Sequence, residues 1–299
     1  MKILNMNWKI WRKVLLVVMM LVSCGFITWR MVGHWNEVNW SLLRFSPVPF
    51  ILSFVLYFSV WELVRGYKLK ILYSVFGYSV KWWDSILINS ATRVAKYIPG
   101  GVWFATAKAL VAERFAIPKL TTFTSMIVDL GFLLSGACVL LAVTVIQNHM
   151  LGFFVAVSCV LIAPVAAILT LKVLRRVWPN RVSRIQPTYV RLLLLSCLYV
   201  VTWAIQTVAL YFLVVSFYPT GLWALPSMAS AWSISWMVGL IAPFAPGGLG
   251  VREALFTQML SSTFPVAICG LIAIVSRFWL ILCELISSVV AWICLKARK

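Results

Sequence analysis

Residues 120–146 read LTTFTSMIVDLGFLLSGACVLLAVTVI, an apolar run whose only charged residue is Asp129. A helix of this length rises roughly 40 Å, which is enough to cross the ~30 Å hydrocarbon core of a bilayer. Comparable apolar runs lie at about 14–33, 48–64, 150–171, 191–217 and 265–295. The fold class we predict is therefore an all-α polytopic membrane protein with six full spans.

The composition of the whole chain indicates the same class of protein. Hydrophobic residues make up 63% of the 299 positions and charged residues only 11%, whereas an average soluble domain has about 25% charged residues. The apolar runs extend from one end of the chain to the other with no polar linker between them. This pattern predicts a single integral membrane domain over residues 1–299.

The basic residues are distributed as membrane topology requires. The formal net charge is +19, but Lys and Arg gather in clusters between the apolar runs rather than along a soluble face. These clusters are Lys2, Lys9, Arg12 and Lys13; Arg65, Lys68, Lys70 and Lys81; Lys172, Arg175, Arg176, Arg181, Arg184 and Arg191; and Lys296, Arg298 and Lys299. Cytoplasmic loops carry the excess of Lys and Arg, so we predict the bacterial inner membrane with both termini cytoplasmic and expect no nucleic-acid partner. The mixed segment from Arg65 to Trp83 is predicted to lie in the cytoplasmic interface.

The N-terminal run has two interpretations. Residues 21–24, LVSC, resemble a lipoprotein cleavage site that follows a short basic segment. The apolar character continues to Trp29, however, which gives about 20 residues, the length of a span rather than of a signal peptide. An uncleaved first helix is therefore the prediction, with the lipoprotein as the alternative.

Two stretches are too irregular to be ordinary spans. Residues 83–118 are interrupted by Pro99-Gly100-Gly101, and residues 222–262 are interrupted by Pro246-Gly247-Gly248. Proline removes a backbone donor and glycine destabilises a helix, so such a triplet ends one helix and permits a sharp reversal. Irregular backbone at membrane depth is tolerated only where protein or a water-filled cavity satisfies it. We predict that both stretches are re-entrant helical hairpins.

The positions of these breaks indicate an internal repeat. The two Pro-Gly-Gly triplets are 147 residues apart, and so are Pro118 and Pro265, each of which precedes a long apolar run. An odd number of predicted spans lies between the hairpins, so the second half enters the membrane from the opposite side. We predict an inverted-topology repeat of about 1–147 and 148–299, an organisation common among secondary transporters.

The same motifs carry a resemblance to a known family. Residues 96–103 read KYIPGGVW and are followed by Ala112-Glu113-Arg114, while residues 245–254 read APGGLGVREA. Together these motifs resemble the flippase-like family typified by the transmembrane region of lysylphosphatidylglycerol synthase, over nearly the whole chain. The resemblance implies translocation of a phospholipid or of a lipid-linked glycan across the membrane. No part of the sequence resembles the soluble aminoacyl-transferase domain of the synthase, so synthesis of the modified lipid is not expected.

The predicted binding site lies at the two broken stretches. A helix that starts inside the membrane presents free N–H groups and the positive end of its dipole, which suits an anion such as a lipid phosphate. We predict a headgroup cavity lined by Arg93, Lys96, Pro99, Gly100, Gly101, Lys108, Pro246, Gly247, Gly248, Arg252 and Glu253. Trp232 and Trp236 are further candidates to face the cargo. The alternative is that the turns only shape the fold and that the cations snorkel to the interface.

Charged residues within the apolar runs form a second group of candidates. Asp129 lies eleven residues after Pro118 and Arg277 twelve after Pro265, so the two occupy nearly equivalent places in the repeats. Because burying either charge alone is costly, we predict that they approach each other near the midplane, as an ion pair or in a shared cavity. Glu284 lies two helical turns beyond Arg277 and is a second candidate partner. In a proton-coupled transporter, Asp129, Glu253 or Glu284 would carry the proton.

Two functions other than transport are also compatible with the sequence. A membrane-embedded lipid- or glycan-modifying enzyme is one alternative, and a non-transporting accessory subunit of a lipid or glycan synthesis complex is another. The seven cysteines lie singly in apolar runs, and the only histidines are His34 and His149, so neither a metal nor another cofactor is expected. The expected partners are a lipid or lipid-linked anionic substrate, membrane lipids, a second copy of the chain, and other envelope-biosynthesis proteins.

Overall fold

The structure is a computed structural model that describes residues 33, 41, 43–97, 102–146, 149–177, 187–241, 248 and 250–298. All regular structure in these residues is helical. The α-helices are α2 (Pro47–Val55), α3 (Glu62–Val75), α4 (Trp82–Ala91), α5 (Trp103–Glu113), α6 (Lys119–Val145), α7 (His149–Val177), α8 (Tyr189–Val215), α9 (Leu225–Ile241), α10 (Val251–Leu260) and α11 (Val266–Ala297). A π-helix, η3 (Leu56–Trp61), joins α2 to α3, and η4 (Arg93–Tyr97) and η5 (Leu222–Ala224) are short 3-10 helices.

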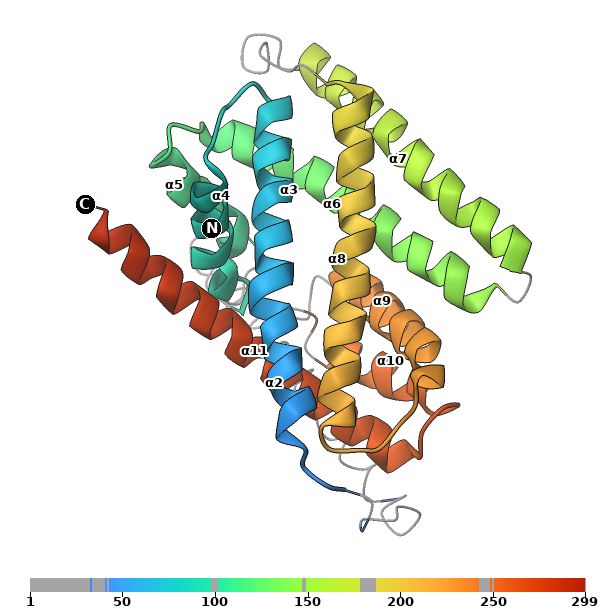
Figure 1. Cartoon of the computed structure of the whole chain (residues 1–299). Coiled ribbons are helices and arrows are strands. Elements are labelled where there is room, and N and C mark those ends of the chain that lie inside the picture. The colour runs from blue at the N-terminus through green and yellow to red at the C-terminus, as the bar shows by residue number, and fades with distance from the viewer. Residues whose placement is uncertain are drawn as a thin grey trace, which may run out of the picture.

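Five helical segments of the described chain are long and apolar enough to cross a membrane (Figure 1). They are the continuous segment α2–η3–α3 and the helices α6, α7, α8 and α11. The prediction of an all-α protein with several helices long and apolar enough to span a membrane is therefore confirmed for the described residues. Apart from its last residue, the predicted first span, 14–33, lies outside the described residues, as do Pro99, Gly100, Gly101, Pro246 and Gly247.

One predicted boundary is wrong. The second span was expected to end near residue 64, with the segment from Arg65 onward lying in the interface, but the helix continues to Val75. Its charged residues Glu62 and Lys68 are buried inside the protein rather than exposed to headgroups. Because their partners come from other helices, the sequence of this segment alone could not show that they are tolerated at depth.

The π-helix η3 determines where two polar side chains point. The backbone N–H of Glu62 donates to the carbonyl oxygen of Tyr57, five residues earlier, instead of four as in an α-helix. In a regular α-helix, side chains five residues apart point about 140° away from each other. The wider turn brings both side chains to the same neighbour, Arg93, and π-bulges of this kind are frequent at functional sites.

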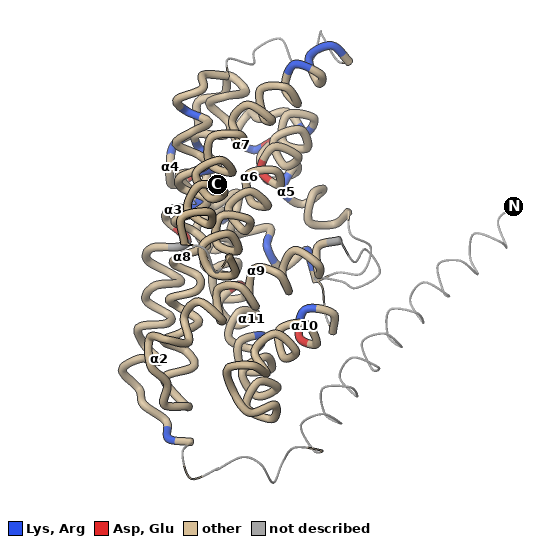
Figure 2. The backbone as a smooth tube through the Cα atoms, turned by 90° about the vertical axis from the view of Figure 1, so that its right-hand side faces the viewer, with Lys and Arg blue, Asp and Glu red and all other residues tan. Residues whose placement is uncertain are grey.

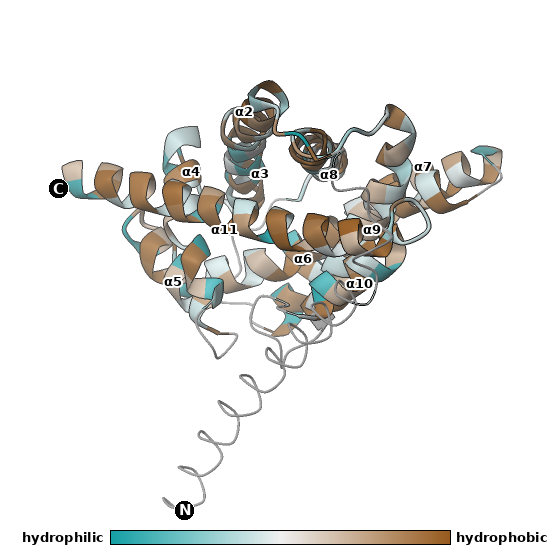
Figure 3. Ribbon diagram, turned by 90° about the horizontal axis from the view of Figure 1, so that it is seen from below, coloured by the Kyte–Doolittle hydropathy of each residue, from teal (hydrophilic) through white to brown (hydrophobic). Residues whose placement is uncertain are grey.

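Two large buried apolar clusters and a smaller one between α6 and α7 hold the bundle together. The first large cluster lies between α3, α4, α5, α6, α7, α8 and the C-terminal part of α11, and the second lies between η3, α8, α9, α10 and the N-terminal part of α11. The long helix α11 crosses the molecule and belongs to both clusters (Figure 1). Its outer face is apolar (Figure 3), and Phe278 on that face is 70% exposed. Such a surface is stable in contact with lipid tails and not with water.

Short helices lie on each side of both predicted breaks. α4, η4 and α5 surround the first Pro-Gly-Gly triplet, and α9 and α10 surround the second. Pro118 and Pro265 directly precede α6 and α11, as the repeat predicts. Figures 1 and 2 place α5 and α10 towards opposite ends of the molecule.

Candidate functional site

Arg93 connects the first broken stretch to α3. Its guanidinium donates two hydrogen bonds to the carboxylate of Glu62, one of them from Nη2 to Oε2 at 3.0 Å, and a third to the hydroxyl of Tyr57 at 2.7 Å. Ser90 and Ser287 donate to the same carboxylate at 3.0 and 3.1 Å. Arg93 is only 1% exposed, so its placement favours a structural role over the predicted contact with a headgroup.

Lys96 and Tyr97 connect the end of η4 to α11. The ammonium of Lys96 forms an ion pair with Glu284, and the hydroxyl of Tyr97 donates to the other carboxylate oxygen at 2.7 Å. Burial lowers the pKa of Lys96 to about 8, while the charge of Glu284 opposes this effect. The sequence suggested Arg277 as the partner of Glu284, but the partner is Lys96, because η4 packs against this part of α11.

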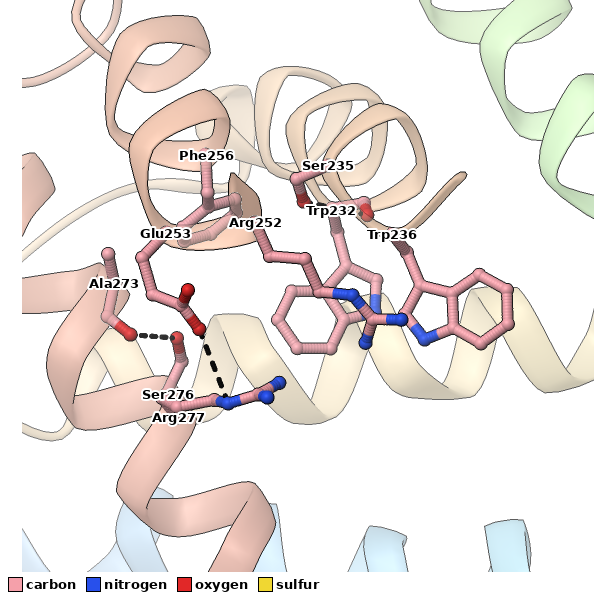
Figure 4. A pocket seen from close by; sticks show the side chains of 9 residues that line it. All are labelled: Trp232, Ser235, Trp236, Arg252, Glu253, Phe256, Ala273, Ser276 and Arg277. Atoms are coloured by element: carbon pink, nitrogen blue, oxygen red, sulfur yellow. Dashed lines mark hydrogen bonds and ion pairs between the residues drawn. The ribbon is translucent and has the colours of Figure 1, made fainter. Parts of the chain in front are cut away.

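A small pocket lies between α9, α10 and α11 (Figure 4). Its walls contain the predicted Arg252 and Glu253, both predicted tryptophans, and Arg277. The full lining is Trp232, Ser235, Trp236, Arg252, Glu253, Phe256, Ala273, Ser276 and Arg277. The free space among these side chains is about 20 Å³, room for roughly one water molecule.

Glu253 fastens α10 at this pocket. One carboxylate oxygen accepts a hydrogen bond from the backbone N–H of Gly250 at 2.5 Å, which caps the N-terminus of α10. The other forms an ion pair with Nε of Arg277 at 3.2 Å. Glu253 therefore takes up one N–H at the helix end that was predicted to bind a ligand, and it neutralises one of the two guanidinium groups beside the pocket.

Arg252 is the cation at this pocket that lacks an ion-pair partner among the described residues. Its guanidinium lies over the ring of Trp236, with 4.8 Å between Cζ and the ring centroid (Figure 4). Within the described part of the chain, no ion pair or hydrogen bond to this guanidinium is found, and its buried Nε has no partner. A cation held against an aromatic face beside a pocket, with its donors unused, is suited to an anionic ligand.

Two glycines make room for the Arg252 side chain. A Cβ at Gly239 would lie 2.3 Å from Cγ of Arg252, and a Cβ at Gly248 would lie 2.5 Å from its Nε. Gly248 also has φ +72°, a conformation that other residues rarely adopt. The predicted site residue Gly248 thus lies beside Arg252, whereas Gly239 is a site residue that the sequence analysis missed, since a single glycine in an apolar helix gives no signal.

Asp129 and Arg277 were predicted to approach each other, but each is paired with a different residue. Asp129 accepts a hydrogen bond from the hydroxyl of Tyr199, and Arg277 pairs with Glu253. The reason is that α10 packs along this part of α11, while Asp129 on α6 faces α8. Lys108 is also away from the pocket, because α5 places it in the neighbourhood of Asp129.

The two broken stretches converge on α11. Arg277 and Glu284 lie two helical turns apart on the same face, and the guanidinium of Arg277 lies 5.8 Å from the ring centroid of Tyr97. Residues of η4 and of α10 thus both contact α11. Figure 2 shows charged segments on α10 within a chain that is mostly uncharged. Glu62 and Tyr97 were not among the predicted site residues, although an acid at the end of an apolar run was a usable signal.

Among the described residues, no group of three or more His, Cys, Asp or Glu side chains is placed to hold a metal ion. Compared with known protein families and with curated proteins, the sequence of the chain gives no match.

Proposed function

We propose that the chain is a transporter that translocates an anionic phospholipid or lipid-linked molecule across the inner membrane. The observation that carries this proposal is the state of Arg252: a guanidinium beside a pocket, stacked on Trp236 and without a hydrogen-bonding partner among the described residues. Leaving the buried Nε of this guanidinium without an acceptor costs free energy, and a phosphate oxygen would supply the missing acceptor.

The local charge supports a negatively charged cargo. Around the pocket and the adjoining end of η4 lie three cations, Lys96, Arg252 and Arg277, and two carboxylates, Glu253 and Glu284. Among the described residues, this leaves one positive charge without a carboxylate to balance it, in a region of low dielectric constant. A headgroup phosphate with one negative charge would balance it.

The architecture that we propose for this function has six spans and two re-entrant hairpins. The hairpins are α4–η4–α5 and α9–α10, related by an inverted-topology repeat of about 1–147 and 148–299, with both termini in the cytoplasm. The short helices on each side of both breaks, the matched prolines before α6 and α11, and the location of α5 and α10 towards opposite ends support it. Broken helices of this kind line substrate sites in many transporters. The resemblance of KYIPGGVW and APGGLGVREA to the flippase-like family agrees with this proposal.

The pocket corresponds to a closed state of the transporter. Its free space of about 20 Å³ is far too small for a headgroup, so binding requires the side chains to separate. The flexible element is Arg252, whose contact with Trp236 is worth about 1–2 kcal/mol and can be exchanged for a contact with phosphate. Transport by alternating access requires a site that opens and closes in this way.

Translocation by the purified protein tests the proposal directly. The protein would be reconstituted into liposomes that contain fluorescent lipids with matched acyl chains and either an anionic phosphodiester, a zwitterionic or a polyprenyl-pyrophosphate headgroup. A membrane-impermeant quencher then reports the fraction of each lipid in the outer leaflet over time. We expect the anionic lipids to cross faster than the zwitterionic one. Equal rates with the protein and in protein-free liposomes, for every lipid, would exclude the function.

Substitution of Gly239 tests the position of Arg252. In Gly239→Ala, the new Cβ would lie 2.3 Å from Cγ of Arg252, so the Arg252 side chain has to leave its position over Trp236. We expect a folded protein whose affinity for a short-chain anionic phospholipid, titrated in detergent by calorimetry, is several-fold weaker. Gly131→Ala is the control, because a Cβ there meets no atom within 4 Å. Unchanged affinity in Gly239→Ala would contradict this role of the glycine.

A further inference from the structure

A second charged cluster lies away from the pocket, between α3, α5, α6 and α8. Its members are Lys68 on α3, Lys108 on α5, Asp129 on α6 and Tyr199 on α8. Lys68 and Lys108 are 5% and 3% exposed, so both amino groups are deep inside the protein. The anion pocket described above uses none of these residues.

The four residues of this cluster differ in how well neighbouring groups compensate their charges. The ammonium of Lys68 lies 3.7 Å from the centroid of the Tyr199 ring, and the Tyr199 hydroxyl donates to Asp129. The nearest aromatic contact found for Lys108 is Phe104, at 5.9 Å, a weak one. Within the described residues, no ion pair joins either lysine to a carboxylate. Lys108 is therefore the most poorly compensated cation of the cluster.

The charged groups that face Lys108 favour loss of its proton. They are the carboxylate of Asp129 and the cations of Arg65, Lys68 and Arg93. Burial lowers the pKa of Lys108, the cations lower it further, and the single carboxylate only partly opposes them. Glu253 and Glu284, by contrast, are held in direct ion pairs, so changing their protonation would break a contact.

We propose that Lys68, Lys108, Asp129 and Tyr199 form a proton-binding site that couples proton movement to translocation. Lys108 is the group that exchanges: its –NH₃⁺ gives one proton to water and becomes –NH₂, and the cluster changes from a net charge of plus one to neutral. This inference rests on the proposed function and names the proton as the ion whose movement drives translocation.

Arg93 and Glu62 lie between the cluster and α11, the helix that also carries Arg277 beside the anion pocket. Arg93 interacts electrostatically with both lysines and is paired with Glu62. Glu62 in turn accepts a hydrogen bond from Ser287 of α11, the helix that carries Arg277 beside the pocket. Networks of paired side chains can carry energetic coupling between sites, which a coupling experiment must demonstrate.

The first experiment measures translocation of an anionic lipid in proteoliposomes with and without a pH gradient. We expect the gradient to change the initial rate of the wild-type protein several-fold. Lys108→Met, which cannot bind the proton, and Lys108→Arg, which cannot release it, are expected to give equal rates with and without the gradient. Lys70→Met removes an exposed lysine of α3 and should respond as the wild type does.

The second experiment follows thermal unfolding of the detergent-solubilised protein from about pH 7 to about pH 10. A lysine with a lowered pKa in the folded protein binds fewer protons there than in the unfolded chain, whose lysines titrate near 10.4. Its contribution therefore raises the melting temperature as the pH rises. This part of the pH dependence should be absent from Lys108→Met and present in Lys70→Met.

The two experiments separate the possible failures. If the wild type moves anionic lipid at a rate that does not depend on the pH gradient, the inference of proton coupling is wrong and the proposed function stands. If the wild type moves no lipid, the proposed function fails, and the coupling inference that rests on it fails as well. If Lys108→Met melts with the same pH dependence as the wild type, Lys108 is not the exchanging group and the inference is overturned.

Discussion

Replacing Arg252 with Ala is expected to lower the rate of anionic-lipid translocation about tenfold or more. A hydrogen bond to a charged group contributes roughly 1.5–3 kcal/mol, and each 1.4 kcal/mol corresponds to about tenfold in an equilibrium constant. Arg252 is the one cation at the pocket for which no competing partner is found among the described residues, so its loss removes the attraction for the headgroup phosphate. The measurement is the quenching assay in proteoliposomes at matched protein content.

Two further variants show whether the shape or only the charge of Arg252 matters. Arg252→Lys keeps the charge but loses the planar, two-pronged donor geometry and the stacking on Trp236, so an intermediate rate is expected. Arg175→Ala removes one exposed positive charge from the end of α7 and should leave the rate unchanged. A normal rate in Arg252→Ala, with normal expression and melting temperature, would remove Arg252 from the site.

Replacing Glu62 with Ala is expected to destabilise the folded protein by about 3–5 kcal/mol, the usual cost of leaving one partner of a buried ion pair uncompensated. The Arg93 guanidinium would lose its carboxylate while remaining 1% exposed, and Ser90 and Ser287 would lose their acceptor. The loss would appear as a lower melting temperature of the purified protein in detergent.

The double variant Glu62→Met with Arg93→Met should recover much of this stability. Replacing both ends of a buried pair with apolar groups of similar volume is often neutral or stabilising. Glu113→Ala is the matched control, because Glu113 pairs with Lys119 at the surface, where both side chains are about half exposed and such pairs contribute little. Equal melting temperatures for Glu62→Ala and Glu113→Ala would show that the Arg93 pair is dispensable.

Part of the candidate site could be predicted from residue types and positions alone. Arg252 and Glu253 follow the second Pro-Gly-Gly triplet directly, and a short helix does begin there, at Val251. Trp232 and Trp236 were also predicted to face the cargo, and both line the pocket. The start of α10 and the neighbouring residues could be anticipated because helix boundaries of this kind are encoded locally, and the contact of these residues with a cargo stays a prediction.

The pairing of the charges could not be predicted in the same way. Lys96 and Glu284 are 188 residues apart, and no local pattern relates η4 to the middle of α11. Asp129 and Arg277 hold nearly equivalent places in the two halves of the sequence, yet each binds a residue of a different neighbouring helix. Equivalent positions along the chain do not become contacts unless the helices that carry them pack together.

The sequence by itself determined that the chain is all-α, that several of its helices are long and apolar enough to span a membrane, and where most of these helices run. Those features follow from the length of each apolar run and from the backbone limits of proline and glycine, which act at each position without help from distant residues. Only the tertiary structure decided that the second span continues to Val75, that a π-helix directs Tyr57 and Glu62 to Arg93, and that no carboxylate of the described residues forms an ion pair with Arg252. A buried charge is stable only beside a partner, and which helices bring partners together is a property of their packing.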